Sequence, residues 1–160
     1  MKKVLLLVAA AFTLAAANAQ TENDLVISAG DAKEIVLGDD MNVVLVSAAP
    51  GQENISLGKA TLQKMDVKFY DRTLEIVPRK DLRSETVYVI VNDVKEVILG
   101  ENTSLRSADI LQSSSLDIYI YQGATARIKT TGKIDAYSLG DFDVNVTRKP
   151  IFSGSSASIN

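Results

Sequence analysis

The most regular pattern in the chain is an alternation of apolar and polar residues in two consecutive segments. Residues 116–121 read Leu-Asp-Ile-Tyr-Ile-Tyr, and residues 124–129 read Ala-Thr-Ala-Arg-Ile-Lys. A period of two is typical of a strand with one buried face and one exposed face. Three other runs, residues 43–46, 87–91 and 97–99, are apolar throughout and rich in Val and Ile. Such runs are typical of strands that are covered on both faces.

Helical periodicity is weak throughout the chain. No window of a dozen residues keeps apolar positions at the helical spacing, and only residues 60–64 suit a single helical turn. Pro50, Pro78 and Pro150 each follow a strand-like run, and Pro50-Gly51 is a strong turn dipeptide. The sequence therefore predicts an all-β fold, built as a sandwich, a barrel or a solenoid.

A recurring Leu-Gly pair favours the solenoid. The pairs begin at positions 37, 57, 99 and 139, so their spacings are 20, 42 and 40 residues, close to multiples of a period of about 20. This is the length of one coil of a β-helix, in which each coil stacks on the last. A β-sandwich is the alternative, and since the flanking residues repeat poorly, a chance recurrence of the pair also stays open.

The first nineteen residues have the pattern of a secretory signal peptide. Lys2 and Lys3 precede an apolar run from Val4 to Ala17, and Ala17-Asn18-Ala19 suits cleavage before Gln20. A membrane anchor is the alternative, but the run is shorter than the ~20 residues of a spanning helix. We therefore expect residues 1–19 to be removed and residues 20–160 to form a single β-solenoid domain. The exported protein would reside in the bacterial periplasm, on the cell surface or in the medium.

Composition narrows the chemistry that is available to this domain. The chain of 160 residues has no Cys, no His and no Trp, which excludes disulfides, thiol nucleophiles, imidazole bases and thiolate or imidazole zinc sites. Without the signal peptide, 15 basic and 20 acidic residues give a net charge of −5. The basic residues form no stripe with aromatic residues between them, so we expect no nucleic-acid partner. No later segment is apolar for long enough to span a membrane.

Several segments resemble a known bacterial family. Residues 71–76 (Asp-Arg-Thr-Leu-Glu-Ile) form a turn and a short strand, and residues 85–99 form two strands around the polar turn Asn92-Asp93. Together with the short strand at 116–120 and the Ser-Gly turn at 153–156, they resemble the putative auto-transporter adhesin, head GIN domain family, which is common in Bacteroidetes. The resemblance implies a secreted or surface-exposed right-handed parallel β-helix. Asn92-Asp93 stands where members of that family often have Pro.

Candidate metal-binding and catalytic residues are few. Asp141, Asp143 and Asn145 alternate along one segment and would present three oxygen ligands in a row, as calcium prefers. The alternative is a solvated strand face paired with Arg127 or Lys129. Asp141 with Asp143, or Asp39 with Asp40, could also serve as the acid and base of a polysaccharide-active enzyme. Because the chain has no Trp and few aromatic residues to stack on sugars, we expect no catalysis and no cofactor other than calcium.

Tyrosines are the most promising ligand-binding candidates. Tyr119, Tyr121 and Tyr137 fall on polar positions of strand-like segments, where they would form an amphipathic strip if stacked on one sheet. Ordinary packing between strands is the alternative. The sequence thus favours a non-catalytic binding, adhesion or structural module of the bacterial envelope, with a glycan or an envelope or host protein as partner. The alternatives are a carbohydrate-binding module assisted by calcium and, last, a polysaccharide-active enzyme.

Overall fold

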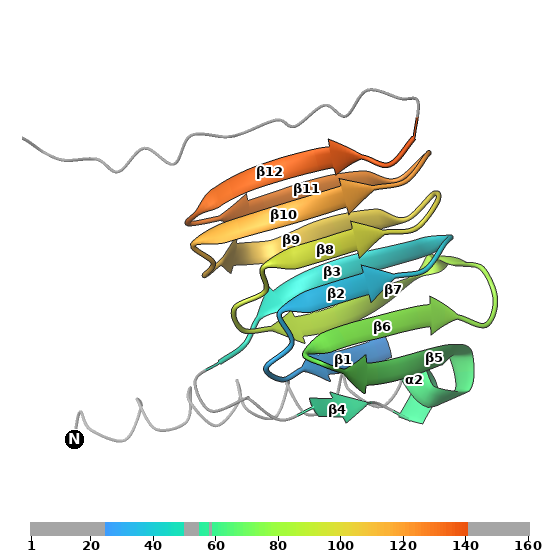
Figure 1. Cartoon of the computed structure of the whole chain (residues 1–160). Helices are drawn as coiled ribbons and strands as arrows, with labels where there is room; N and C mark the ends of the chain where they lie inside the picture. Colours follow the sequence, from blue (N-terminus) through green and yellow to red (C-terminus); the bar gives the residue numbers. More distant parts are fainter. Residues whose placement is uncertain (1–24, 50–54, 58, 141–160) are drawn as a thin grey trace, which may run out of the picture.

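The computed structural model describes residues 25–49, 55–57 and 59–140 (Figure 1). In these ranges the chain forms twelve strands and one helix, so the predicted all-β fold class is confirmed. The helix, α2 (Lys59–Lys64), lies where the sequence predicted a single turn. No helix among the described residues is long and apolar enough to cross a bilayer. The predicted signal peptide lies outside the described residues.

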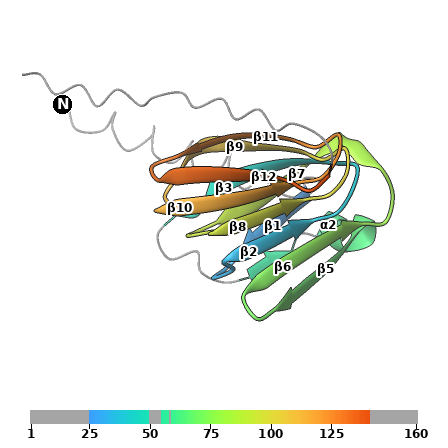
Figure 2. The same ribbon diagram turned by 45° about the horizontal axis from the view of Figure 1, so that its top comes forward.

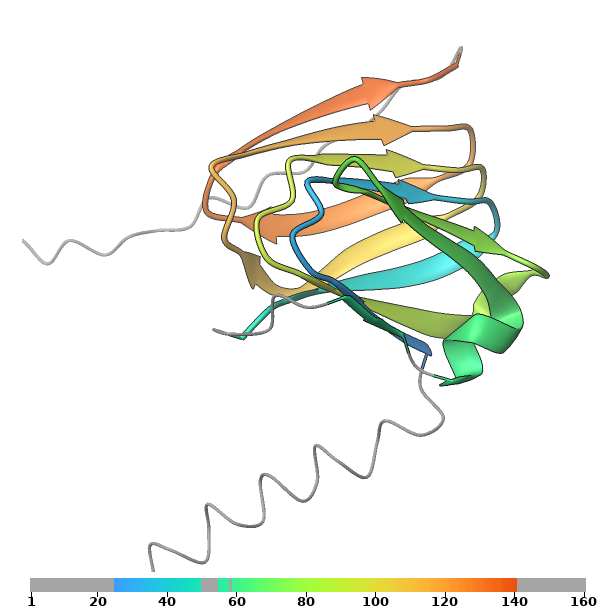
Figure 3. The ribbon, with the colours of Figure 1, turned by 60° about the horizontal axis from the view of Figure 1, so that its bottom comes forward.

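The strands form two sheets of six, which face each other as two layers (Figures 2 and 3). In spatial order, sheet B contains β12 (Lys133–Ser138), β10 (Ser115–Ile120), β8 (Glu96–Leu99), β2 (Glu34–Leu37), β6 (Thr73–Pro78) and β5 (Met65–Tyr70). Sheet A contains β11 (Thr125–Thr130), β9 (Ser104–Leu111), β3 (Met41–Ser47), β7 (Leu82–Val91), β1 (Leu25–Ala29) and β4 (Ile55–Leu57). Two facing layers resemble a β-sandwich, which was the alternative architecture.

The core lies between the two sheets, and the alternation in the sequence determines which residues reach it. In β10, Leu116, Ile118 and Ile120 are at most 4% exposed, whereas Asp117 and Tyr119 lie on the outer face. The same alternation places one apolar row of each strand in a shared core. Burial of these rows supplies the main stabilisation of a protein without disulfides, at roughly 25 cal/mol per Å² of apolar surface.

The apolar runs of the sequence are buried to different degrees. In β3, Val43, Val44 and Leu45 are all fully buried, as predicted for a strand that is covered on both faces. In β7 and β8, the inward residues are buried, but the outward residues Tyr88 and Ile98 are only half-buried. The outer faces of these two strands, one in each sheet, are therefore partly apolar and partly exposed.

From β7 onward, successive strands alternate between the two sheets and pair with their sheet neighbours in parallel. In sheet B, Val97 pairs with Ile118, and Ile118 pairs with Ala136. These steps of 21 and 18 residues agree with the period of about 20. The antiparallel pairs among the described strands are β1 with β4 and β5 with β6, at the end opposite β12.

The order of the strands differs from simple stacking in chain order. β2 lies between β6 and β8, and β3 lies between β7 and β9. Leu37 is therefore paired with Leu99, 62 positions later, whereas Leu57 pairs with Ile27 in the other sheet. The Leu-Gly repeat marks equivalent positions in some strands, but it does not reveal which strands are neighbours. Strand pairing depends on register and side-chain fit, which a period alone does not encode.

Candidate functional site

Four carboxylates form a line across the outer face of sheet B. Asp135 on β12 pairs with Asp117 on β10, Asp117 pairs with Glu96 on β8, and Glu96 pairs with Glu34 on β2. Because adjacent strands lie about 4.8 Å apart, the line crosses four strands over roughly 14 Å. We call these four residues the acidic column.

A second line of side chains runs beside the acidic column, two residues further along each strand. Tyr137 pairs with Tyr119, Tyr119 with Ile98, and Ile98 with Val36. We call these four residues the tyrosine column. The rings of Tyr119 and Tyr137 are stacked, with centroids 4.9 Å apart and planes inclined by 20°. Such an offset stack leaves part of each ring uncovered, and Tyr137 is 44% exposed.

Another tyrosine follows two residues after Tyr119, just beyond the end of β10. Ile120 pairs with Ser138, which places Tyr121 beside Leu139, and the side chains of Tyr121 and Leu139 are 43% and 37% exposed. Tyr119 and Tyr137 are in direct contact on the outer face of sheet B, and Tyr121 is an exposed residue just after β10. A ligand-binding role for the three tyrosines remains a prediction.

The carboxylates at the two ends of the acidic column have polar partners. Asp135 forms an ion pair with Lys133 at 2.6 Å, and Glu34 accepts a hydrogen bond from the Thr73 hydroxyl at 3.0 Å. The two middle carboxylates, Glu96 and Asp117, form no ion pair with any described residue. Like charges opposite each other on adjacent strands destabilise a sheet, so the centre of the column carries an uncompensated electrostatic cost.

Burial and neighbouring charged groups raise the pKa values of two side chains in these columns. Partial burial, together with Glu34 and Asp117, raises the pKa of Glu96 above its ordinary value. Burial, followed by Glu96, Asp117 and Tyr137, raises the pKa of Tyr119. The Tyr119 phenol therefore remains protonated near neutral pH and can donate a hydrogen bond beside acceptor carboxylates.

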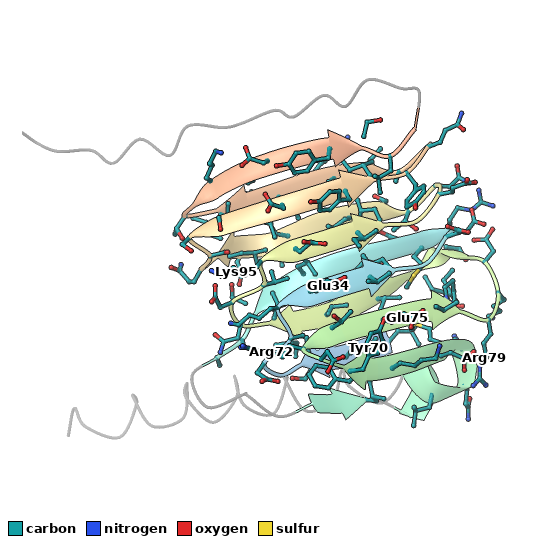
Figure 4. The ribbon with its side chains drawn as sticks, in the orientation of Figure 1. Glu34, Tyr70, Arg72, Glu75, Arg79 and Lys95 are labelled. Atoms are coloured by element: carbon teal, nitrogen blue, oxygen red, sulfur yellow. The ribbon has the colours of Figure 1, made fainter. Side chains whose placement is uncertain are left out.

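The cations nearest to the start of β8 are engaged elsewhere. Lys95 forms an ion pair with Asp93 at 2.7 Å and donates to the Ser114 hydroxyl at 2.9 Å. Lys33 also binds Asp93, at 3.0 Å. Figure 4 shows Lys95 at the margin of sheet B and Glu34 on its outer face. These lysines hold the turn before β8, so they do not neutralise Glu96.

The other predicted residues are not part of this face. Asp141, Asp143 and Asn145 lie outside the described residues, and the described ones contain no group of three carboxylates close enough to hold a metal ion. In the turn after β2, Asp39 accepts a hydrogen bond from the Glu101 backbone N–H at 2.7 Å. Asp40 contacts Arg83 at 3.5 Å. Asp39 and Asp40 thus connect turns, which differs from the acid and base role considered for them.

The members of the acidic column share a short sequence pattern. Each of its members begins a short motif, Glu-Ile-Val-Leu at 34–37, Glu-Val-Ile-Leu at 96–99, Asp-Ile-Tyr-Ile at 117–120 and Asp-Ala-Tyr-Ser at 135–138. An acidic residue precedes an inward apolar residue by one position in each motif. Only the strand order shows that the four motifs are neighbours, because the first two are separated by 62 residues.

Of three comparisons with known proteins, one found a match, to a family model. No curated protein and no solved structure matched the chain. The family described as putative auto-transporter adhesin, head GIN domain, matches residues 31–146, which include all strands from β2 to β12. The chain therefore belongs to the putative auto-transporter adhesin, head GIN domain family.

Proposed function

We propose that this protein is a non-catalytic binding module of the bacterial envelope, and that the outer face of sheet B is its recognition surface. The observation that carries the proposal is the stacked pair of Tyr119 and Tyr137 beside the carboxylates of Asp117 and Asp135. Tyrosine supplies a large contact area with a polar tip, and exposed tyrosines are enriched at binding surfaces. The name of the family, an adhesin head domain, supports the same role.

A glycan is the first partner class to test. Carboxylates accept hydrogen bonds from sugar hydroxyls, and the uncovered part of a tyrosine ring can pack on the apolar face of a sugar. On sheet B the two groups recur together on β10 and β12, as Asp117 with Tyr119 and as Asp135 with Tyr137. If Asp141, Asp143 and Asn145 hold calcium, the protein would be a calcium-assisted carbohydrate-binding module, the alternative that the sequence suggested.

The proposed architecture is a right-handed parallel β-helix from β7 to β12. Its support is the alternation of successive strands between two sheets, with parallel pairing and steps of about 20 residues. Parallel stacking gives the recognition face its form, because equivalent residues of successive coils lie in straight lines. A rigid face of this kind binds through many weak contacts at defined spacing.

Export is part of the proposal. The surface-binding role suggested by the family agrees with the signal peptide pattern of residues 1–19. Protein isolated from the outside of the cytoplasmic membrane should begin at Gln20, which intact-mass measurement would establish.

A glycan array tests the proposed binding surface. We expect the wild type to bind a subset of glycans, and we expect the double variant Tyr119→Ala, Tyr137→Ala to bind the same glycans at least about tenfold more weakly. Tyr70→Ala is the matched control, because Tyr70 is an exposed tyrosine of the same sheet on β5, four strands away from Tyr119. A parallel array in chelator detects any contribution of calcium.

The outcomes separate the alternatives. Equal binding by the wild type and the tyrosine double variant would remove the tyrosine column from the recognition surface. Loss of binding in chelator alone would support the calcium-assisted module. Turnover of a bound polysaccharide that disappears in Asp143→Asn would replace the binding role with an enzymatic one.

A further inference from the structure

Most of the described Lys and Arg side chains form ion pairs with nearby carboxylates, and the three that do not lie close together. Ion pairs within 4.0 Å involve every described Lys and Arg side chain except Arg106, Arg127 and Lys129. Arg106 lies on β9, and Arg127 and Lys129 lie on the adjacent strand β11. All three point away from the core, so the outer face of sheet A carries an uncompensated positive patch.

The geometry of this basic patch is set by strand register. Arg127 is paired directly with Arg106, and Lys129 follows two residues later on the same face. All three side chains are exposed. Two arginines opposite each other repel, and neither has a carboxylate partner among the residues that the structure describes.

The acidic column lies on the opposite side of the molecule at the same end of the stack. It crosses β12, β10, β8 and β2 of sheet B, while the basic patch occupies β11 and β9 of sheet A (Figure 2). Unpaired negative charge at Glu96 and Asp117 on one outer face thus corresponds to unpaired positive charge at Arg106 and Arg127 on the other. The electrostatic cost of each face would be relieved by contact with the other face of a second molecule.

We propose that the outer face of sheet B binds a second copy of this chain through the outer face of that copy's sheet A. Stacked sheets pack about 10 Å apart, a distance that side chains of both faces can span. In this contact, Arg106 and Arg127 of one copy approach Glu96 and Asp117 of the other. Tyr119 is covered by the docked sheet. The two faces differ, so the contact does not close on itself and further copies can add in the same direction.

The available area makes this association weak. Six strands at about 4.8 Å, each presenting some six residues at about 3.3 Å, give a face of roughly 29 by 20 Å. Full contact would bury roughly 1,200 Å² in total, at the lower limit for specific interfaces. We therefore expect reversible association that depends on protein concentration. Raising salt from about 0.1 M to about 1 M, which shortens the Debye length from about 10 Å to about 3 Å, should weaken it.

This inference rests on the proposed function, because it names a second copy as the partner of the same recognition face. Sedimentation velocity of the exported protein, residues 20–160, across a range of concentrations tests it. The wild type should show reversible self-association, and Asp117→Lys alone and Arg127→Glu alone should each weaken it at least tenfold. An equal mixture of the two variants should restore it, since each reversed face then meets an opposite charge.

The mixture also shows that both variants are folded, because only folded molecules can restore the contact. Glu101→Lys is the matched control, since Glu101 is an exposed acidic residue in the turn between β8 and β9, and this variant should leave association unchanged.

A monomeric wild type at low salt would overturn the inference, as would association that neither charge reversal affects. If the wild type is monomeric but binds glycans through its tyrosines, the proposed function stands and the self-association is wrong. If charge-dependent self-association occurs without any glycan binding, the face serves self-association alone.

Discussion

At the scale of single residues, close backbone contact explains why glycine follows leucine in two of the Leu-Gly pairs. A Cβ atom on Gly100 would lie 2.5 Å from the carbonyl carbon of Gly38 and 2.7 Å from its oxygen. The same Gly38 oxygen accepts a hydrogen bond from the Thr103 hydroxyl at 2.7 Å. Gly38 and Gly100 thus let two neighbouring coils turn at the same place, and the leucine before each glycine enters the core.

We therefore expect Gly100→Ala to destabilise the fold by about 2 kcal/mol or more, because the added methyl meets backbone atoms that cannot move cheaply. Urea unfolding measures this change. Glu101→Ala is the control, since this exposed side chain should matter by less than about 0.5 kcal/mol. Equal stability of the two variants would show that the turns after β2 and β8 are further apart than described.

At the scale of elements, the sequence predicts individual strands well and their neighbours poorly. The alternation at 116–121 and at 124–129 identifies β10 and β11, because one buried face leaves a local pattern. The position of β2 leaves no such pattern. Its neighbours β6 and β8 are specified by fit across distances of about 40 and 60 residues. For the same reason the outward position of Tyr119 and Tyr137 could be predicted, but the acidic column could not.

Introduced cysteines can test the placement of β2, because the chain has none of its own. Val36 on β2 pairs with Ile98 on β8 on one side and with Glu75 on β6 on the other. We expect Val36→Cys with Ile98→Cys to form a disulfide under mild oxidation, detected by intact mass and by mobility on a non-reducing gel. The link would close a long loop and could stabilise the fold by about 2–4 kcal/mol.

The matched pair is Glu75→Cys with Ile98→Cys, which would be neighbours if coils stacked in chain order. With β2 between them, these positions are two strand spacings apart, about 9.6 Å, beyond the limit of about 7 Å for a disulfide. This second pair should remain reduced. Cross-linking of the second pair in place of the first would contradict the strand order.

At the scale of the whole molecule, the ionisable groups divide into two sets with opposite effects on stability. Hydrogen bonds from Arg83 lower the pKa of Asp81 from 3.8 to about 2. The pKa values of Asp66, Glu85 and Asp93 are also lowered, in each case first by a hydrogen bond from a cationic partner. Carboxyls of this kind stabilise the fold above their unfolded-state pKa, and that contribution is lost as pH falls. Thermal stability should therefore decrease between about pH 4 and pH 2.

Glu96 has the opposite effect on the pH dependence of stability. Its pKa is raised, so the folded protein holds the proton of the Glu96 carboxyl group more tightly than the unfolded chain does. Its contribution to the stability of the fold falls as pH rises from the ordinary glutamate pKa of 4.5 through the raised pKa. Glu96→Gln removes the charge and should raise stability at pH 7 by up to about 1 kcal/mol, within the range for cross-strand pairs, or roughly 3 °C in Tm.

The gain should disappear below about pH 4, where Glu96 is protonated in both the folded and the unfolded state. Glu75→Gln on the same sheet is the control (Figure 4), because it loses an ion pair with Lys68 at 3.5 Å and should bring no gain at either pH. Calorimetry of the three proteins at pH 4 and pH 7 measures these differences. A Glu96→Gln variant that is less stable than the wild type at pH 7 would mean that a cation neutralises the column, and the electrostatic argument for a positively charged partner face would fail with it.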